Sequence, residues 1–315
     1  MISSIKTKKQ PPFLFKLLFF ITILFFLDLA IGYLLKHFYF KQDSGILYRT
    51  TYAIDSTKAD ILIFGSSTAN HHYVPGLFTD KLHLSCYNTG RDGNSILFSY
   101  AILKGVLKRY IPKIVILDIN PGEFQEDQDS YDRISSLLPY YDTHPEIRSI
   151  IQLKSPFEKY KLISKIYPFN SLIFTIGVGN ADFNKNREFI NDENGYVPLK
   201  NTWNEPLDTD TSIFLYKLDS TKIKIFKSFI NECHKSNVRL YVFLSPKFIQ
   251  YKNEDPTVEI VNRICTETNI PFYRFRNDSF FLKHGNLFDD KGHLNAEGAK
   301  IYTGIVIDRI TSERR

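Results

Sequence analysis

The chain has 315 residues, of which 43% are hydrophobic and 15% aromatic, enough apolar material for one α/β domain with a buried core. Its 40 basic and 34 acidic residues give a formal net charge of +6, and no concentrated basic tract follows the N-terminal lysines. This composition argues against a nucleic-acid partner.

The three cysteines, Cys86, Cys233 and Cys265, lack the close spacing of a structural zinc site. We expect them to be buried as small apolar side chains, and we leave open a disulfide between two of them.

The N-terminal region is typical of a membrane anchor. Lys6, Lys8 and Lys9 precede a nearly uninterrupted apolar run from Leu17 to Leu35, which as a helix would cross about 30 Å of hydrocarbon. Basic residues before the run favour a cytoplasmic N-terminus and a domain on the outer side of the cell membrane. We therefore expect residues 1–36 to form a cytoplasmic tip and a single-pass anchor. A cleaved signal peptide and a buried helix of a soluble protein are the alternatives.

One acidic residue, Asp28, interrupts the apolar run. A carboxylate that faces lipid is costly, so we expect Asp28 to face a partner helix or a thinned part of the bilayer. Residues 37–59 are predicted to form a juxtamembrane connector between the anchor and the domain.

The domain begins with a short apolar stretch, Asp60–Phe64, which predicts a buried parallel strand. It ends in a Gly-Ser-Ser turn at residues 65–67. Open α/β sheets place their sites at the carboxyl ends of strands, where a serine at such a turn is exposed for attack. Ser67 is therefore a candidate nucleophile. The adjacent His71 and His72 are interpreted either as metal or substrate ligands or as polar surface residues near a helix start.

Strands and helices alternate through most of the remaining chain. We expect strands at 84–88, 113–119, 237–244 and 271–276, and helices at 95–109, 211–236, 256–268 and 295–311. This alternation predicts a three-layer α/β/α sandwich around a parallel sheet. Gly90 and Gly93 follow the second strand and Asn120 follows the third, so they would share one sheet edge with Ser67.

Residues 122–210 break the alternation and are too many for a simple connection. We expect a partly helical insertion near the site that acts as a lid or substrate platform. Its aromatic residues, among them Tyr140, Tyr141 and Trp203, would either contact a sugar or acyl group or pack the insertion's own core.

The last loop pairs an acid with a histidine, Asp290 and His293, just before the final helix. An aspartate at this offset can approach one imidazole nitrogen, fix the tautomer and stabilise the imidazolium, while the other nitrogen takes a proton from a serine. Taken alone, the pair is also compatible with surface polarity or metal ligation.

Together these motifs resemble the SGNH, or GDSL-type, hydrolase superfamily from about Asp60 to Thr311, apart from the insertion. The resemblance implies a flavodoxin-like sheet, a catalytic domain over residues 60–315, and a triad of Ser67, Asp290 and His293. Asp289 is the weaker candidate for the acid because it misses the three-residue offset. No metal or organic cofactor is required for the implied reaction.

The resemblance also implies an oxyanion hole. The backbone N–H of Gly93 would be one donor, with Gly90 as the alternative, and the side chain of Asn120 would be another. The family has Gly-x-Asn-Asp in this third block, whereas here Asn120 is preceded by Leu117-Asp118-Ile119 and followed by Pro121.

Ser66 replaces the family's usual acid before the nucleophile, a variant that resembles membrane-anchored members acting in lipoteichoic acid D-alanylation and polysaccharide O-acetylation. We therefore expect a serine esterase or acyltransferase that acts on ester groups, above all O-acetyl groups, of extracytoplasmic glycans or envelope polymers. Its other expected partners are the membrane and a membrane-bound acyltransferase. The alternatives are a non-catalytic scaffold of a membrane acylation complex, and a metal-dependent phosphoesterase that uses His71, His72 and Asp290.

Overall fold

The centre of the domain is a parallel sheet of five strands. The structure, a computed structural model, describes residues 12–181 and 194–312. The strand order is β2-β1-β3-β5-β7, as in flavodoxin-like folds. The strands are β1 (Ile61–Phe64), β2 (Cys86–Asn88), β3 (Ile114–Asp118), β5 (Arg239–Leu244) and β7 (Phe272–Arg274). The predicted parallel α/β fold is thus confirmed.

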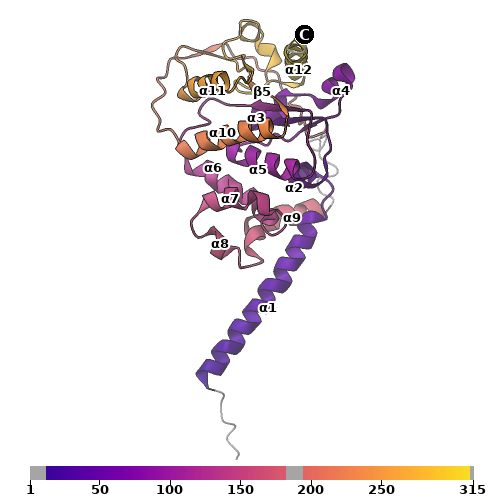
Figure 1. The fold of residues 1–315 in the computed structure, drawn as a ribbon, viewed down its shortest axis with the longest axis vertical. Helices are drawn as coiled ribbons and strands as arrows, with labels where there is room; N and C mark the ends of the chain where they lie inside the picture. Colours follow the sequence, from indigo (N-terminus) through magenta and orange to yellow (C-terminus); the bar gives the residue numbers. More distant parts are fainter. Residues whose placement is uncertain (1–11, 182–193, 313–315) are drawn as a thin grey trace, which may run out of the picture.

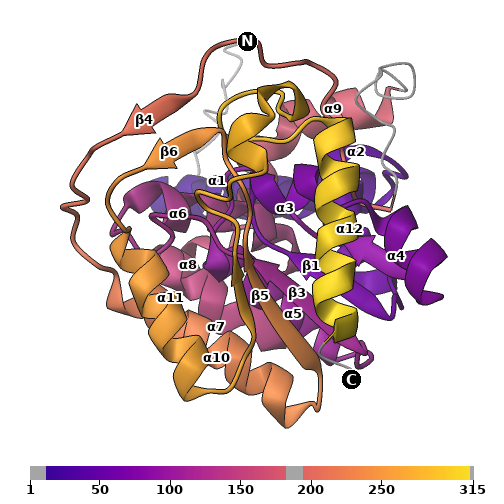
Figure 2. The same cartoon turned by 90° about the horizontal axis from the view of Figure 1, so that it is seen from above.

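Alternate residues of the strands pack into two separate cores, one on each face of the sheet. Leu62 and Val115 belong to one core and Ile63 and Ile116 to the other. The first core is covered by α5 (Ile96–Leu107), α10 (Ser220–Lys235) and α11 (Pro256–Glu267); the second is covered by α3 (Ser67–His72), α4 (Pro75–Leu82) and α12 (Ala296–Ser312). Figure 2 shows α10 and α11 on one side of β5 and α12 on the other. These are the three expected layers.

Helix α1 (Phe13–Phe40) projects from the lower end of the domain in Figure 1. It is long and apolar enough to cross a membrane, and no residue of its most apolar stretch is buried. The lysines on which the predicted orientation depends, at positions 6, 8 and 9, lie outside the described residues.

The structure gives Asp28 a partner that the sequence analysis did not foresee. Its carboxylate accepts hydrogen bonds from Ser164 Oγ (2.5 Å) and from the backbone N–H groups of Lys165 (2.7 Å) and Ile166 (3.3 Å). Asp28 therefore binds a loop of its own chain rather than a partner helix. The expectation failed because nothing in the sequence links positions so far apart.

The expected connector is part of the folded domain. Helix α1 continues to Phe40, and α2 (Gly45–Thr51) and a π-helical turn (Tyr52–Ser56) follow. Leu47 and Ile54 are buried in the first core. Arg49 of α2 donates a hydrogen bond to Asn70 Oδ1 (2.7 Å) in α3, so this segment contacts the helix that begins at Ser67.

The insertion consists of two parts with different places in the fold. Residues 128–180 form short helices and 3-10 turns: α6 (Gln128–Asp132), α7 (Arg148–Ile151), α8 (Glu158–Lys161), α9 (Ile173–Asn180) and turns at Arg133–Tyr140, Pro145–Ile147, Gln152–Lys154 and Tyr167–Leu172. In Figure 1, α7 and α8 lie below α5, and α9 and the turn Tyr167–Leu172 contact α1. Residues 194–210 instead run beside the C-terminal loop, where the backbone N–H of Trp203 donates to the Phe288 carbonyl (2.7 Å).

Most predicted boundaries agree with the structure to within two or three residues, with one exception. The helix expected from residue 211 begins only at Ser220, because the side chain of Asp219 accepts hydrogen bonds from the N–H groups of Thr221 and Lys222 and caps it there. A small second sheet, β4 (Asp208–Asp210) with β6 (Ile249–Tyr251), and 3-10 turns at Phe281–Lys283 and Gly285–Leu287 complete the fold.

Candidate active site

The serine turn is built by a glycine that no other residue could replace without strain. Gly65 follows β1 with φ +144°, and a Cβ at this position would lie 2.6 Å from the carbonyl oxygen of Asp118 and 2.8 Å from Ala69 Cβ. The chain can therefore turn directly from β1 into α3. Ser67 is the first residue of that helix and is half-buried at the carboxyl edge of the sheet.

The structure brings together the three residues predicted to form a triad. Ser67 Oγ lies 2.8 Å from His293 Nε2, across 226 positions of sequence. His293 Nδ1 lies 3.0 Å and 2.9 Å from the two carboxylate oxygens of Asp290. When Nδ1–H donates to a carboxylate, Nε2 is free of hydrogen and can accept the serine proton. The arrangement is that of a nucleophile, a base and an orienting acid.

Asp290, and not Asp289, faces the histidine. Asp289 accepts a hydrogen bond from the backbone N–H of Asn201 (2.7 Å). Partial burial acts to raise the pKa of Asp290, but hydrogen bonds from His293 and from the Gly292 N–H outweigh it and lower that pKa. The carboxylate is therefore charged at neutral pH and can stabilise an imidazolium.

His71 and His72 are buried, so the interpretation of this pair as polar surface residues is wrong. Burial, with the nearby His293 and His71, holds the pKa of His72 well below its usual range, so His72 is neutral. Its Nε2 accepts the Leu294 N–H (2.9 Å), which ties the helix that carries Ser67 to the loop that carries His293.

His71 is engaged on both ring nitrogens. Nδ1 lies 2.7 Å from the Val197 carbonyl oxygen and Nε2 lies 3.2 Å from Asp92 Oδ2. Burial acts to lower the pKa of His71, but Asp92 raises it overall. Within residues 12–181 and 194–312, no group of three His, Cys, Asp or Glu side chains is arranged to hold a metal ion. The hydrogen bonds of His71 to Val197 and Asp92, and of His72 to Leu294, link separate segments of the site.

A buried carboxylate beneath the serine turn was missed by the sequence analysis. Asp118, at the end of β3, accepts hydrogen bonds from Thr68 Oγ1 (2.5 Å) and from the hydroxyls of Tyr73 and Ser245. Burial raises the pKa of Asp118 to about 6. The available signal was an acid in an otherwise apolar strand, since such a residue must find buried donors. This cluster joins β3, α3 and the loop after β5 directly below Ser67.

Asn120 lies at the serine turn, as predicted. Its Nδ2 donates to Ser66 Oγ (2.7 Å), and its Oδ1 accepts from Thr68 Oγ1 (3.3 Å). These partners fix the orientation of the amide. Because an amide nitrogen carries two hydrogens, one remains for a ligand beside Ser67.

The two candidate glycines of the second loop lie in different places. Gly90 packs against α3, where a Cβ would lie 2.6 Å from the Asn70 nitrogen, but its N–H donates to Asn88 Oδ1 (2.9 Å). Gly93 is exposed, has φ +70°, and lies against the guanidinium of Arg133. The assignment of Gly93 as an oxyanion donor stays a prediction.

The aromatic residues singled out in the insertion lie in different surroundings. Tyr140 is fully buried, and its hydroxyl contacts those of Tyr39 (3.1 Å) and Thr51 (2.7 Å). Trp203 is half-buried beside the C-terminal loop, against the second core. Tyr140 therefore packs the fold, whereas Trp203 lies near the triad loop.

The three cysteines are buried and unpaired, as expected for small apolar side chains.

Comparisons with known proteins give no relative, since neither a scan against protein-family models nor a search of curated proteins finds a match. The chemistry of the site itself is therefore what indicates a function.

Proposed function

We propose that the protein is a membrane-anchored serine acyl esterase or acyltransferase of the SGNH type. The observation that carries the proposal is the 2.8 Å contact between Ser67 Oγ and His293 Nε2, with the Asp290 carboxylate on the far nitrogen of the ring. A serine, a histidine and an acid in this order of contacts activate the hydroxyl as a nucleophile.

The reaction proceeds in two steps. Ser67 Oγ attacks the carbonyl carbon of an ester while His293 Nε2 takes the hydroxyl proton, and the tetrahedral intermediate then expels the alcohol, which receives that proton. The acyl group now lies on Ser67. Water or a second hydroxyl, deprotonated by His293, attacks the acyl-serine and forms a second tetrahedral intermediate. Its bond to Ser67 Oγ then breaks, Oγ takes the proton back from His293, and acid or a new ester is released. Asp290 stays charged throughout and stabilises the imidazolium.

The oxyanion would be held by the backbone N–H of Ser67, the free N–H of the Asn120 amide and the N–H of Gly93. Donors of this kind act where negative charge develops in the transition state. The hydrogen bonds that Asn120 makes with Ser66 and Thr68 support this role, because they orient the amide before substrate binds.

The substrate class follows from the resemblance and from the expected topology. With α1 as an uncleaved anchor and the N-terminus in the cytoplasm, the domain faces the outer side of the cell membrane. Acylated glycans or envelope polymers are the esters found there, and O-acetyl groups fit the motifs best.

An assay on O-acetylated glycans tests the proposal. We expect the wild-type protein to release acetate or to transfer it to a sugar hydroxyl, and Ser67→Ala and His293→Ala to do neither. Activity that survives both substitutions contradicts the proposal. If the wild type is also inactive and the protein co-purifies with a membrane-bound acyltransferase regardless of Ser67→Ala, the scaffold alternative is supported instead.

A further inference from the structure

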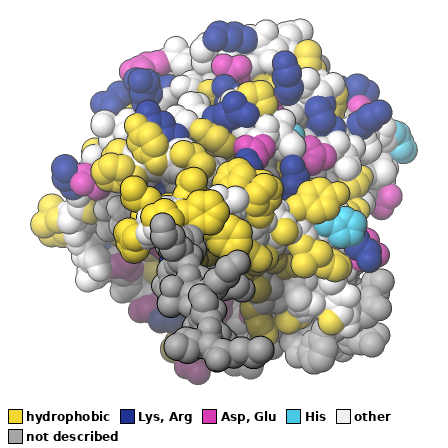
Figure 3. Space-filling model, turned by 90° about the horizontal axis from the view of Figure 1, so that it is seen from below, with side chains coloured by type: hydrophobic (Ala, Val, Ile, Leu, Met, Phe, Trp, Pro, Cys, Tyr) yellow, Lys and Arg dark blue, Asp and Glu magenta, His cyan; other side chains and the backbone are white. Residues whose placement is uncertain are grey.

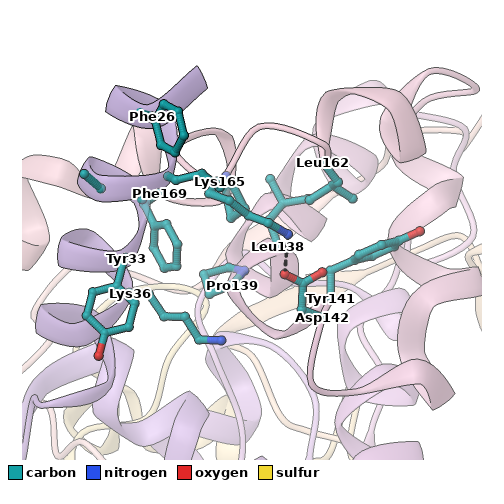
Figure 4. A pocket seen from close by; sticks show the side chains of 14 residues that line it. Phe26, Tyr33, Lys36, Leu138, Pro139, Tyr141, Asp142, Leu162, Lys165 and Phe169 are labelled. Atoms are coloured by element: carbon teal, nitrogen blue, oxygen red, sulfur yellow. Dashed lines mark hydrogen bonds and ion pairs between the residues drawn. The ribbon is translucent and has the colours of Figure 1, made fainter. Parts of the chain in front are cut away.

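An apolar hollow of the described chain lies far from the triad, between α1 and the insertion. It is a cavity of about 580 Å³ lined on one side by Phe26, Ala30 and Tyr33 of α1, and on the other by Leu138, Leu162 and Phe169. In Figure 4, Phe26, Tyr33 and Lys36 come from α1, and Leu138, Leu162 and Phe169 come from the insertion. Lys36 lies at the end of the hollow away from Phe26, which we call its mouth, and the Lys165–Asp142 ion pair (2.8 Å) lies at the rim. Its size and lining suit a small apolar ligand.

The depth of this cavity along α1 can be deduced from the helix geometry. Asp28 lies roughly 22 Å along the axis from Phe13, and Gly32 roughly 29 Å. A hydrocarbon core of about 30 Å that begins at either Phe13 or Leu17 therefore includes both residues. The insertion contacts α1 at these two positions, since a Cβ on Gly32 would lie 2.5 Å from the Lys165 backbone. If α1 spans the membrane, residues 162–169 lie at membrane depth.

The role of Asp28 supports this placement. Backbone N–H groups of an irregular loop have no water to bind inside a bilayer and must find acceptors within the protein. The carboxylate of Asp28 accepts the N–H groups of Lys165 and Ile166 and the Ser164 hydroxyl. An acid in an apolar helix is thereby explained as the acceptor for a loop at membrane depth.

The surface around this contact is apolar as well. We call the residues Phe157, Tyr160, Ile163, Ile173 and Phe174 the apolar rim; between 51% and 83% of each is exposed. Figure 3, seen from the side on which α1 leaves the domain, shows hydrophobic side chains gathered at the centre of this face, those of the helix included, with charged side chains of both signs toward the periphery. An exposed apolar patch bordered by charged residues and continuous with a helix long enough to span a membrane fits a lipid surface.

We propose that the apolar rim is immersed in the lipid leaflet next to the domain, and that the cavity between α1 and the insertion holds an aliphatic chain of a membrane lipid. The Lys36 ammonium at the mouth lies where the phosphate of that lipid would be. The proposal rests on the membrane anchor of the proposed function and is independent of the chemistry at Ser67.

The test uses the full chain in vesicles of phosphatidylethanolamine and phosphatidylglycerol that contain a phospholipid with a diazirine near the end of its acyl chain. After irradiation, we expect labelled peptides both from α1 and from residues 138–142 and 162–169. Ala30→Phe, which fills the cavity, should remove the label from the insertion. Ile23→Phe, on the same helix but outside the cavity, should leave it unchanged.

A photo-reactive benzoylphenylalanine at Phe174 should cross-link to lipid, whereas at Leu215, which is 90% exposed beside α11, it should not. Label on α1 without label on the insertion overturns the lipid site while the anchor stands. Label on the insertion that persists in Ala30→Phe does the same. A protein adduct at Phe174 in native membranes overturns it in favour of a protein partner. Absence of label on α1 itself would refute the membrane anchor. An unreactive Ser67 in a wild-type protein that is labelled as expected would refute only the proposed enzyme activity.

Discussion

Asp118 is a buried ionisable residue of the site whose titration should affect folding. Its pKa of about 6 lies above the value of 3.8 expected when the carboxyl is exposed in the unfolded chain. Between these pH values the folded state holds a proton that the unfolded state has lost, so this group's contribution to stability falls as pH rises through that window, by roughly 3 kcal/mol in all.

This predicts a specific difference between wild type and Asp118→Asn. The amide does not ionise, so the variant should lack the part of the decline in stability between about pH 4 and pH 6 that comes from this carboxyl. Urea unfolding at several pH values measures the difference. Parallel stability curves for the two proteins over that range would contradict the assignment of the raised pKa to Asp118.

Asn120 is expected to contribute to catalysis more than to folding. Loss of one oxyanion donor typically costs about 3 kcal/mol of transition-state stabilisation, so Asn120→Ala should lower the rate of ester turnover by about two to three orders of magnitude. Ser66→Ala removes only a hydrogen-bond partner of Asn120 and should have a much smaller effect. Equal effects of the two substitutions on the turnover rate would argue against Asn120 as a donor.

At the scale of elements, the turn between β1 and α3 depends on its glycine. Gly65→Ala places a Cβ against the Asp118 carbonyl at a positive φ, so we expect a loss of roughly 2 kcal/mol or more in the free energy of unfolding, with lower serine reactivity. Gly76→Ala in α4, where nothing lies within 4 Å of the new Cβ, is the matched control and should be neutral or slightly stabilising. Thermal unfolding of the two variants makes the comparison, and similar losses would show that the turn is not strained.

The contact between α1 and the insertion gives a second prediction for an element. Asp28→Leu leaves the Ser164 hydroxyl and two N–H groups without their acceptor, so residues 158–172 should exchange amide hydrogens faster and be cleaved more readily by proteases. Asp28→Asn keeps one acceptor oxygen and should lie between wild type and Asp28→Leu. Unchanged exchange in Asp28→Leu would show that this contact does not hold the insertion.

The sequence predicts the regular elements well because their signals are local. The apolar strands and the stripe of α12 follow from periodicity, and Asp290 and His293 lie three residues apart on one loop, so their contact is set by short-range geometry. Asp28 with Ser164, and Asp118 with Tyr73 and Ser245, meet only through the fold, and no periodicity encodes such pairs. The insertion was unpredictable for the same reason, since its short turns owe their form to packing against α1 and α5.

On the scale of the whole molecule, the candidate active site and the anchor lie at different ends. Figure 1 shows α3 and α12 in the upper part of the domain, while α1 leaves from the lower part. None of the residues that line the apolar cavity belongs to the triad or its hydrogen-bond partners. This separation favours an ester on a polymer that reaches away from the bilayer over an ester buried among lipid chains.

The central claim is that Ser67 is a nucleophile activated by His293, and its direct test is covalent labelling by a fluorophosphonate. Wild type should form a stable adduct at Ser67, located by peptide mass spectrometry. Ser67→Ala should form none, His293→Ala should react far more slowly, and Ser66→Ala should still be labelled. Equal labelling of wild type and Ser67→Ala, or no labelling of a folded wild type, would contradict the account.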